Sequence, residues 1–105
     1  MATQNEICTA IKNRKAVTFT YRNEGKTRTA ELYRQGDNQT TKVPQVRAYQ
    51  TSGHSESNTL GWKLFDIADI KGLKETKNDI KFPRKGYDPD KTPPDEDIYT
   101  HCQVR

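Results

Sequence analysis

The stretch at residues 17–33, VTFTYRNEGKTRTAELY, constrains the fold more than any other part of this sequence. Its apolar residues Val17, Phe19 and Tyr21 alternate with polar ones, and a period of two in strand-favouring residues predicts a strand with one buried face. A polar turn follows around Gly25, a residue that adopts positive φ without steric cost. The remainder of the stretch is again extended in character. We therefore predict a β-hairpin, which indicates a fold class without naming any chemistry.

A short amphipathic helix is predicted to precede the hairpin. Thr3 is followed three residues later by Glu6, which matches a capping box. The apolar residues that follow recur at helical spacing; they are Ile7, Ala10 and Ile11. A helix of this length is marginal alone, so it should end near Lys15 and pack on the sheet.

Further strands are predicted after the hairpin. In chain order we expect a polar loop at residues 34–41, a strand at 42–50, a second polar loop at 51–58, and a strand, a tight turn and a short strand within 61–76. Pro44 cannot donate a ladder hydrogen bond, so it should lie at the start of its strand or on an edge. The predicted fold class is therefore mainly β with one N-terminal helix (α+β) and a sheet of about five strands.

The end of the chain differs in composition from the rest. Residues 1–76 contain the predicted helix and sheet, whereas residues 77–105 form an extension rich in proline and aspartate, as in an extended linker. Within this extension, Ile98, Thr100, Cys102 and Val104 nevertheless alternate with Tyr99, His101 and Gln103 in a strand pattern. Two interpretations stay open: the tail returns and pairs with a sheet edge, or its terminal strand frays.

Composition limits the chain to one small domain. It has 105 residues, of which 30% are hydrophobic, and a mean hydropathy of -1.10. No apolar run approaches the roughly 20 residues that a membrane span requires, and the N-terminus lacks the pattern of a secretion signal. We therefore expect no membrane association and a cytoplasmic location. The net charge of +4 suits a polyanionic partner.

The two cysteines, Cys8 and Cys102, lie near opposite ends of the chain. Without an export signal, reduced thiols are expected rather than a disulfide. Together with His54 and His101 the cysteines lack the spacing of a zinc site. No metal and no cofactor are therefore predicted.

The order of short motifs resembles the WYL domain family. The residues that carry the resemblance are Ala10, Ile11, Phe19, Tyr21, Arg28, Glu31, Tyr33, Ala48, Tyr49, Trp62, Leu64, Phe65 and Ile70. The resemblance covers residues 7–76 and implies a small Sm-like β-barrel with an N-terminal helix. It also implies a ligand-sensing or nucleic-acid-binding regulatory module of the kind found in bacterial regulators and phage-defence systems. Pro44, Gln45 and Val46 replace the family's Trp-Tyr-Leu motif, and Asp69 stands where the family commonly has arginine.

Binding of single-stranded nucleic acid or of a nucleotide-like anion is the first functional hypothesis. Basic and aromatic residues are interleaved along the predicted strands, where cations contact phosphates and aromatic faces stack on bases. The candidate binding residues are Arg28, Arg47, Tyr21, Tyr33, Tyr49, Lys63, His54 and Ser55. Arg28 matches a family position, and Arg47 lies mid-strand, where a guanidinium can hold a phosphate in a bidentate contact. The alternative is that the aromatic residues, among them Phe19, Trp62 and Phe65, fill the core while the cations only solubilise the rim.

A protein-interaction module is the second hypothesis, in which a strand edge or the acidic residues 95–97 dock a partner protein. A homo-oligomer is also compatible with so small a core. An enzyme is not predicted. His54 lies between Ser52 and Ser55, but a polar loop offers no oxyanion hole and little preorganisation, so no catalytic residue is assigned.

Overall fold

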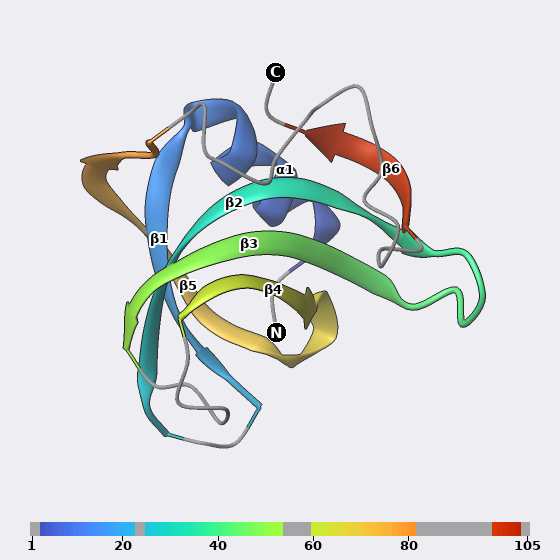
Figure 1. Ribbon diagram of the computed structural model, residues 1–105, viewed down its shortest axis with the longest axis horizontal. Helices are drawn as coiled ribbons and strands as arrows, with labels where there is room; N and C mark the ends of the chain where they lie inside the picture. Colours follow the sequence, from blue (N-terminus) through green and yellow to red (C-terminus); the bar gives the residue numbers. More distant parts are fainter. Residues whose placement is uncertain (1–2, 23–24, 54–59, 82–97, 104–105) are drawn as a thin grey trace.

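The computed structural model describes residues 3–22, 25–53, 60–81 and 98–103. These segments form a mainly β fold with one N-terminal helix, as predicted (Figure 1). In chain order the elements are α1 (Gln4–Asn13), β1 (Lys15–Tyr21), β2 (Thr27–Asn38), β3 (Pro44–Gly53), β4 (Gly61–Asp66), the 3-10 turn η1 (Ile67–Asp69), β5 (Ile70–Asp79) and β6 (Ile98–Gln103).

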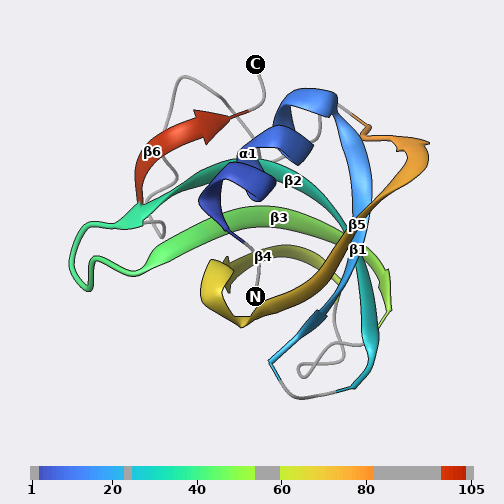
Figure 2. The same ribbon diagram turned by 180° about the vertical axis from the view of Figure 1, so that it is seen from behind.

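The described strands belong to one antiparallel sheet. Its order is β4-β3-β2-β1-β5, and β6 pairs with the second half of β2. The sheet is strongly curved, and α1 lies against one of its faces, across β2 (Figure 1 and Figure 2). Within the described segments β4 and β5 do not pair with each other, so the sheet is open there. Closure into a barrel therefore stays a prediction.

The predicted hairpin is β1–β2, in which Val17 pairs with Ala30. The alternation predicted the buried face correctly, because Val17, Phe19 and Tyr21 are all buried. The rings of Phe19 and Tyr21 pack edge-on against Phe65, with centroid separations of 5.2 and 4.8 Å. Edge-to-face pairs of this kind add about 0.5–1.5 kcal/mol each beyond area burial. The core role expected for Phe19 and Phe65 is confirmed.

The N-terminus of α1 is fixed by the predicted capping box. The Thr3 hydroxyl accepts a hydrogen bond from the Glu6 amide at 3.2 Å, and the Thr3 amide donates to the Glu6 carboxylate at 3.1 Å. These bonds satisfy two of the amides that a helix start leaves open. The buried face of α1 consists of Ile7, Ala10 and Ile11. No helix in the described part of the chain is long and apolar enough to cross a membrane.

Strand β2 continues to Asn38 instead of ending near Tyr33. Residues 34–37 pair with β3 on one side and with β6 on the other, so their backbone groups are satisfied in two ladders, and Asn38 pairs with β6. Arg34 and Gln35 are buried as a result, each at 2% exposure. The polar loop predicted to begin at residue 34 is therefore wrong over these positions. Polar composition indicates a loop only where no distant strand supplies a partner.

Two other boundaries also differ from prediction. Residues 51–53 continue β3 and pair with β2, so they are not loop. Strand β5 runs to Asp79 and so continues past residue 76, where composition changes along the sequence. In both cases the ladder with a neighbouring strand extends the element beyond its apolar residues.

The C-terminal strand predicted from alternation is present as β6. Its return to the sheet places Cys102 beside α1, where it forms a disulfide with Cys8; the two Cα atoms are 5.7 Å apart. The expectation of reduced thiols is therefore wrong. A sequence separation of 94 conceals this proximity, which exists only because the tail folds back. The cytoplasmic location on which that expectation depended stays a prediction.

Candidate ligand-binding face on β3 and β4

The guanidinium of Arg28 lies inside the core instead of on a surface. Arg28 is 4% exposed, and its guanidinium carbon lies 5.1 Å from the ring centre of Tyr21 and 5.4 Å from that of Phe65. Its Nη1 atom donates a hydrogen bond to Oε1 of Gln50 at 3.3 Å. Aromatic faces compensate part of the cost of burying this charge. In this arrangement the side chain stabilises the interior and presents no cation to solvent.

Two of the predicted tyrosines are also buried. The Tyr21 hydroxyl accepts a hydrogen bond from the Asp66 amide at 2.9 Å. Burial raises the pKa of this phenol above its ordinary value. The Tyr33 ring is fully buried and packs against Trp62 at 5.2 Å, and its hydroxyl donates to Oε1 of Glu31 at 2.7 Å. Neither ring offers a free face on which a base could stack.

A second group of predicted residues meets at a partly exposed surface. Tyr49 of β3 and Trp62 of β4 are register partners, so their side chains lie on the same face of the sheet. Their rings pack edge-on at 5.2 Å. Arg47, two residues from Tyr49, shares this face and places its guanidinium 4.8 Å from the ring centre of Trp62. We call Arg47, Tyr49 and Trp62 the β3–β4 face.

The other predicted site residues do not join this face. Lys63 is the register partner of buried Ala48, so its side chain leaves β4 on the opposite side of the sheet. His54 and Ser55 lie outside the described residues. Trp62, which one of the two interpretations placed in the core, packs against the core but is partly exposed, and it contacts both other members of the face. The register of β4 against β3 reveals that Trp62 lies on this face, whereas no local sequence pattern around Trp62 indicates it.

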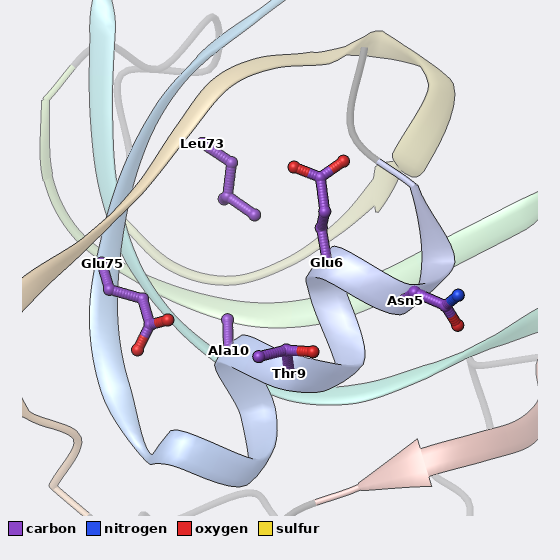
Figure 3. Close-up of a pocket in the computed structure, with 6 residues that line it drawn as sticks. All are labelled: Asn5, Glu6, Thr9, Ala10, Leu73 and Glu75. Atoms are coloured by element: carbon purple, nitrogen blue, oxygen red, sulfur yellow. The ribbon is translucent and has the colours of Figure 1, made fainter.

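A hollow of about 290 Å³ lies between α1 and β5 (Figure 3). Two carboxylates border it, and both already serve the fold. Glu6 completes the capping box, and both oxygens of Glu75 accept hydrogen bonds from the side-chain amide Nδ2 of Asn13 at 3.1 Å. We therefore assign these carboxylates to the structure of the helix and its contact with β5.

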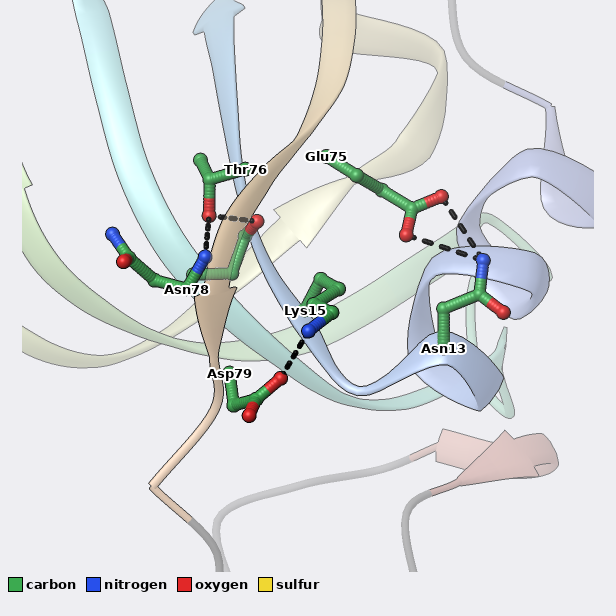
Figure 4. A network of polar contacts seen from close by, with 7 residues as sticks. Asn13, Lys15, Glu75, Thr76, Asn78 and Asp79 are labelled. Atoms are coloured by element: carbon green, nitrogen blue, oxygen red, sulfur yellow. Dashed lines mark hydrogen bonds and ion pairs between the residues drawn. The ribbon is translucent and has the colours of Figure 1, made fainter.

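Further polar contacts hold β5 against β1 (Figure 4). Lys15 forms an ion pair with Asp79, and the Thr76 hydroxyl donates to the carbonyl of Ala16 at 2.8 Å. The amide of Asn78 donates to the same Thr76 hydroxyl at 3.1 Å. These contacts fix the C-terminal end of β5. In the described part of the chain, β5 pairs with β1 alone.

Among the described residues no group of three potential metal ligands is present. Comparison with known proteins adds no identification: no family model, no curated protein and no solved structure matches this chain.

Proposed function

We propose that this chain is a non-enzymatic binding module for single-stranded nucleic acid or a nucleotide-like anion, and that the β3–β4 face is its contact surface. One observation carries the proposal: the Arg47 guanidinium lies 4.8 Å over the Trp62 ring, with Tyr49 edge-on at 5.2 Å. Partly exposed aromatic rings provide stacking platforms for bases. A guanidinium held against such a ring is preorganised to contact the phosphate of a stacked nucleotide.

The charge of the whole chain supports the same ligand class. A net charge of +4 raises the local concentration of polyanions and accelerates their association. The regulatory role and the Sm-like barrel that the WYL resemblance implies are part of this proposal. The observed order of one helix followed by antiparallel strands is compatible with both.

Salt dependence tests the proposal, because each phosphate contact on a single strand contributes a slope of about -0.7 in log affinity against log salt. The probe is a fluorescently labelled oligodeoxythymidine, measured by anisotropy over a salt series. Arg47→Ala should reduce the magnitude of the slope by about 0.7. The matched control is Lys12→Ala, which removes an exposed cation from the last turn of α1 and should leave the slope unchanged.

Trp62 supplies an independent readout, because it is the single tryptophan of the chain. Stacking of a base on its ring should quench its fluorescence as oligonucleotide is added, to the same saturation point that anisotropy reports. Absence of binding at low salt would refute the proposal. Equal slopes for Arg47→Ala and Lys12→Ala would show that binding occurs away from the β3–β4 face.

A protein-interaction module is the second candidate, and the exposed edge of the sheet favours it. In the described segments β4 pairs with β3 alone, and Leu60 and Leu64 near this edge are 53% and 39% exposed. Unpaired edges with apolar residues recruit extended partner strands, including those of a second copy. Sedimentation over a concentration series tests for self-association. Leu64→Lys should abolish self-association through the β4 edge. An association constant unchanged by this substitution would exclude that edge as the interface.

A further inference from the structure

Leu64 lies next to the β3–β4 face and is one of three large apolar side chains that are exposed in the described part of the chain, at 39%. It is the register partner of Arg47, just as Trp62 is the register partner of Tyr49. Residues opposite each other on adjacent strands point to the same side of a sheet. Leu64 therefore places an exposed apolar side chain beside the aromatic rings and the guanidinium of the β3–β4 face.

The position of Leu64 along β4 suits contact with a stacked base. Trp62 and Leu64 are two residues apart on this strand, which separates their Cα atoms by roughly 7 Å. A pyrimidine ring stacked on Trp62 therefore has one edge within reach of the Leu64 side chain. In the described part of the chain β4 pairs with β3 alone, so no further described strand flanks Leu64 on its other side.

The polar groups on either side of Leu64 favour one orientation of the nucleotide. The Arg47 guanidinium lies 4.8 Å from the ring centre of Trp62 and supplies the phosphate contact proposed above. Asp66, two residues beyond Leu64 on the same side of the sheet, accepts a hydrogen bond from Nε2 of its register partner Gln45 at 2.8 Å. A carboxylate repels a phosphate but not an apolar base edge. The phosphate should therefore stay at Arg47 while the base edge lies towards Leu64.

We propose that Leu64 gives the β3–β4 face a preference for thymine over uracil, through contact of its side chain with the methyl group of the base, and so for single-stranded DNA over RNA. This inference rests on the proposed function. Apolar side chains read thymine through its methyl group in many complexes with DNA. Uracil lacks this methyl group, so it cannot make the contact. The ligand class is therefore a single strand of DNA that contains thymine.

The test compares labelled oligodeoxythymidine with labelled oligodeoxyuridine of the same length, because the two strands differ only in the methyl group of each base. The intact chain should bind oligodeoxythymidine roughly fourfold more tightly, the factor that burial of one methyl group predicts. The ratio of the two affinities should stay constant over a sodium chloride series, since an apolar contact releases no counterions from phosphate. Equal affinities for the two strands would overturn the inference.

Substitutions at Leu64 locate the preference, and because the side chain is exposed they should leave the protein folded. Leu64→Ala should reduce the ratio to near one by weakening the binding of oligodeoxythymidine alone. Leu64→Met keeps a large apolar side chain and should retain the ratio. The matched control is Leu60→Ala, which removes an exposed leucine that precedes β4 and should leave the ratio unchanged. A ratio that survives in Leu64→Ala would show that the Trp62 ring itself senses the methyl group and would overturn the assignment to Leu64.

Failure of this inference is distinguishable from failure of the proposed function. Arg47→Ala should weaken the binding of both strands and reduce both salt slopes by about 0.7, without changing the ratio of affinities. Binding that depends on Arg47 but is equal for the two strands leaves the β3–β4 face as the contact surface and removes the role of Leu64. If Leu64→Ala changes neither affinity while Leu64→Lys abolishes self-association, Leu64 belongs to a protein-docking edge, which would also contradict the inference.

Discussion

Loss of the Cys8–Cys102 disulfide should be the most destabilising chemical change available to this chain. The bond joins positions 94 apart and so closes nearly the whole chain into one loop. In the chain-entropy model, a loop of this length stabilises the fold by about 4–5 kcal/mol, and typical measured values are about 2–4 kcal/mol. Domains of this size have total stabilities of about 5–15 kcal/mol. A large part of the stability should therefore depend on one bond.

Urea unfolding followed by far-UV circular dichroism measures this effect. With a denaturant slope of about 1–3 kcal/mol per molar, Cys102→Ser should lower the midpoint by about 1–3 M. The double variant Cys8→Ser, Cys102→Ser should show the same loss, and added dithiothreitol should change neither variant further. A midpoint equal to that of the oxidised protein would refute the reasoning, because it would mean that the bond constrains neither the unfolded chain nor β6.

Two other predictions concern the backbone and the core. Gly53→Ala should destabilise the fold by about 2–4 kcal/mol, because at φ +92° its new Cβ would overlap the Thr27 carbonyl and approach the Arg28 Cα to 2.7 Å. The control Gly25→Ala, at φ +70° in open space, should destabilise it by only about 1–2 kcal/mol. Equal losses of stability for the two variants in thermal unfolding would contradict the overlap at Gly53. Burial raises the pKa of Tyr21, so its stabilising contribution is complete below the unfolded value of about 10 and is lost as pH rises through the raised pKa. Above about pH 10 the free energy of unfolding should therefore fall more steeply in the intact chain than in Tyr21→Phe. Parallel profiles of unfolding free energy against pH for the two proteins would exclude ionisation of Tyr21 as the cause.

Local patterns predicted the parts of the fold that local interactions determine. The capping box depends on residues three positions apart, and the hairpin on alternation across a short turn, so both could be inferred from neighbouring residues. The second half of β2 and the disulfide depend on β6, whose residues lie sixty or more positions away from their partners along the chain. Such pairings leave no local periodicity, and the polar composition of residues 34–38 indicated a loop instead.

The candidate site shows the same limit. Arg28 and Arg47 both lie within strands, and nothing in their immediate neighbours separates them. Strand register does: Arg28 pairs with Phe19 on the buried face, whereas Arg47 lies on the face that Tyr49 and Trp62 share. The local sequence therefore indicates both cations as candidates but does not distinguish the buried one, Arg28, from the one at a partly exposed surface, Arg47.

Salt-dependent binding of labelled oligodeoxythymidine to the intact chain, with Arg47→Ala and Lys12→Ala beside it, decides whether the β3–β4 face binds single strands. Affinity should weaken linearly in log salt, with a slope smaller by about 0.7 in Arg47→Ala, and Trp62 fluorescence should be quenched to saturation with binding. A strand that does not bind at low salt, or a Lys12→Ala slope reduced as much as that of Arg47→Ala, would contradict binding at this face.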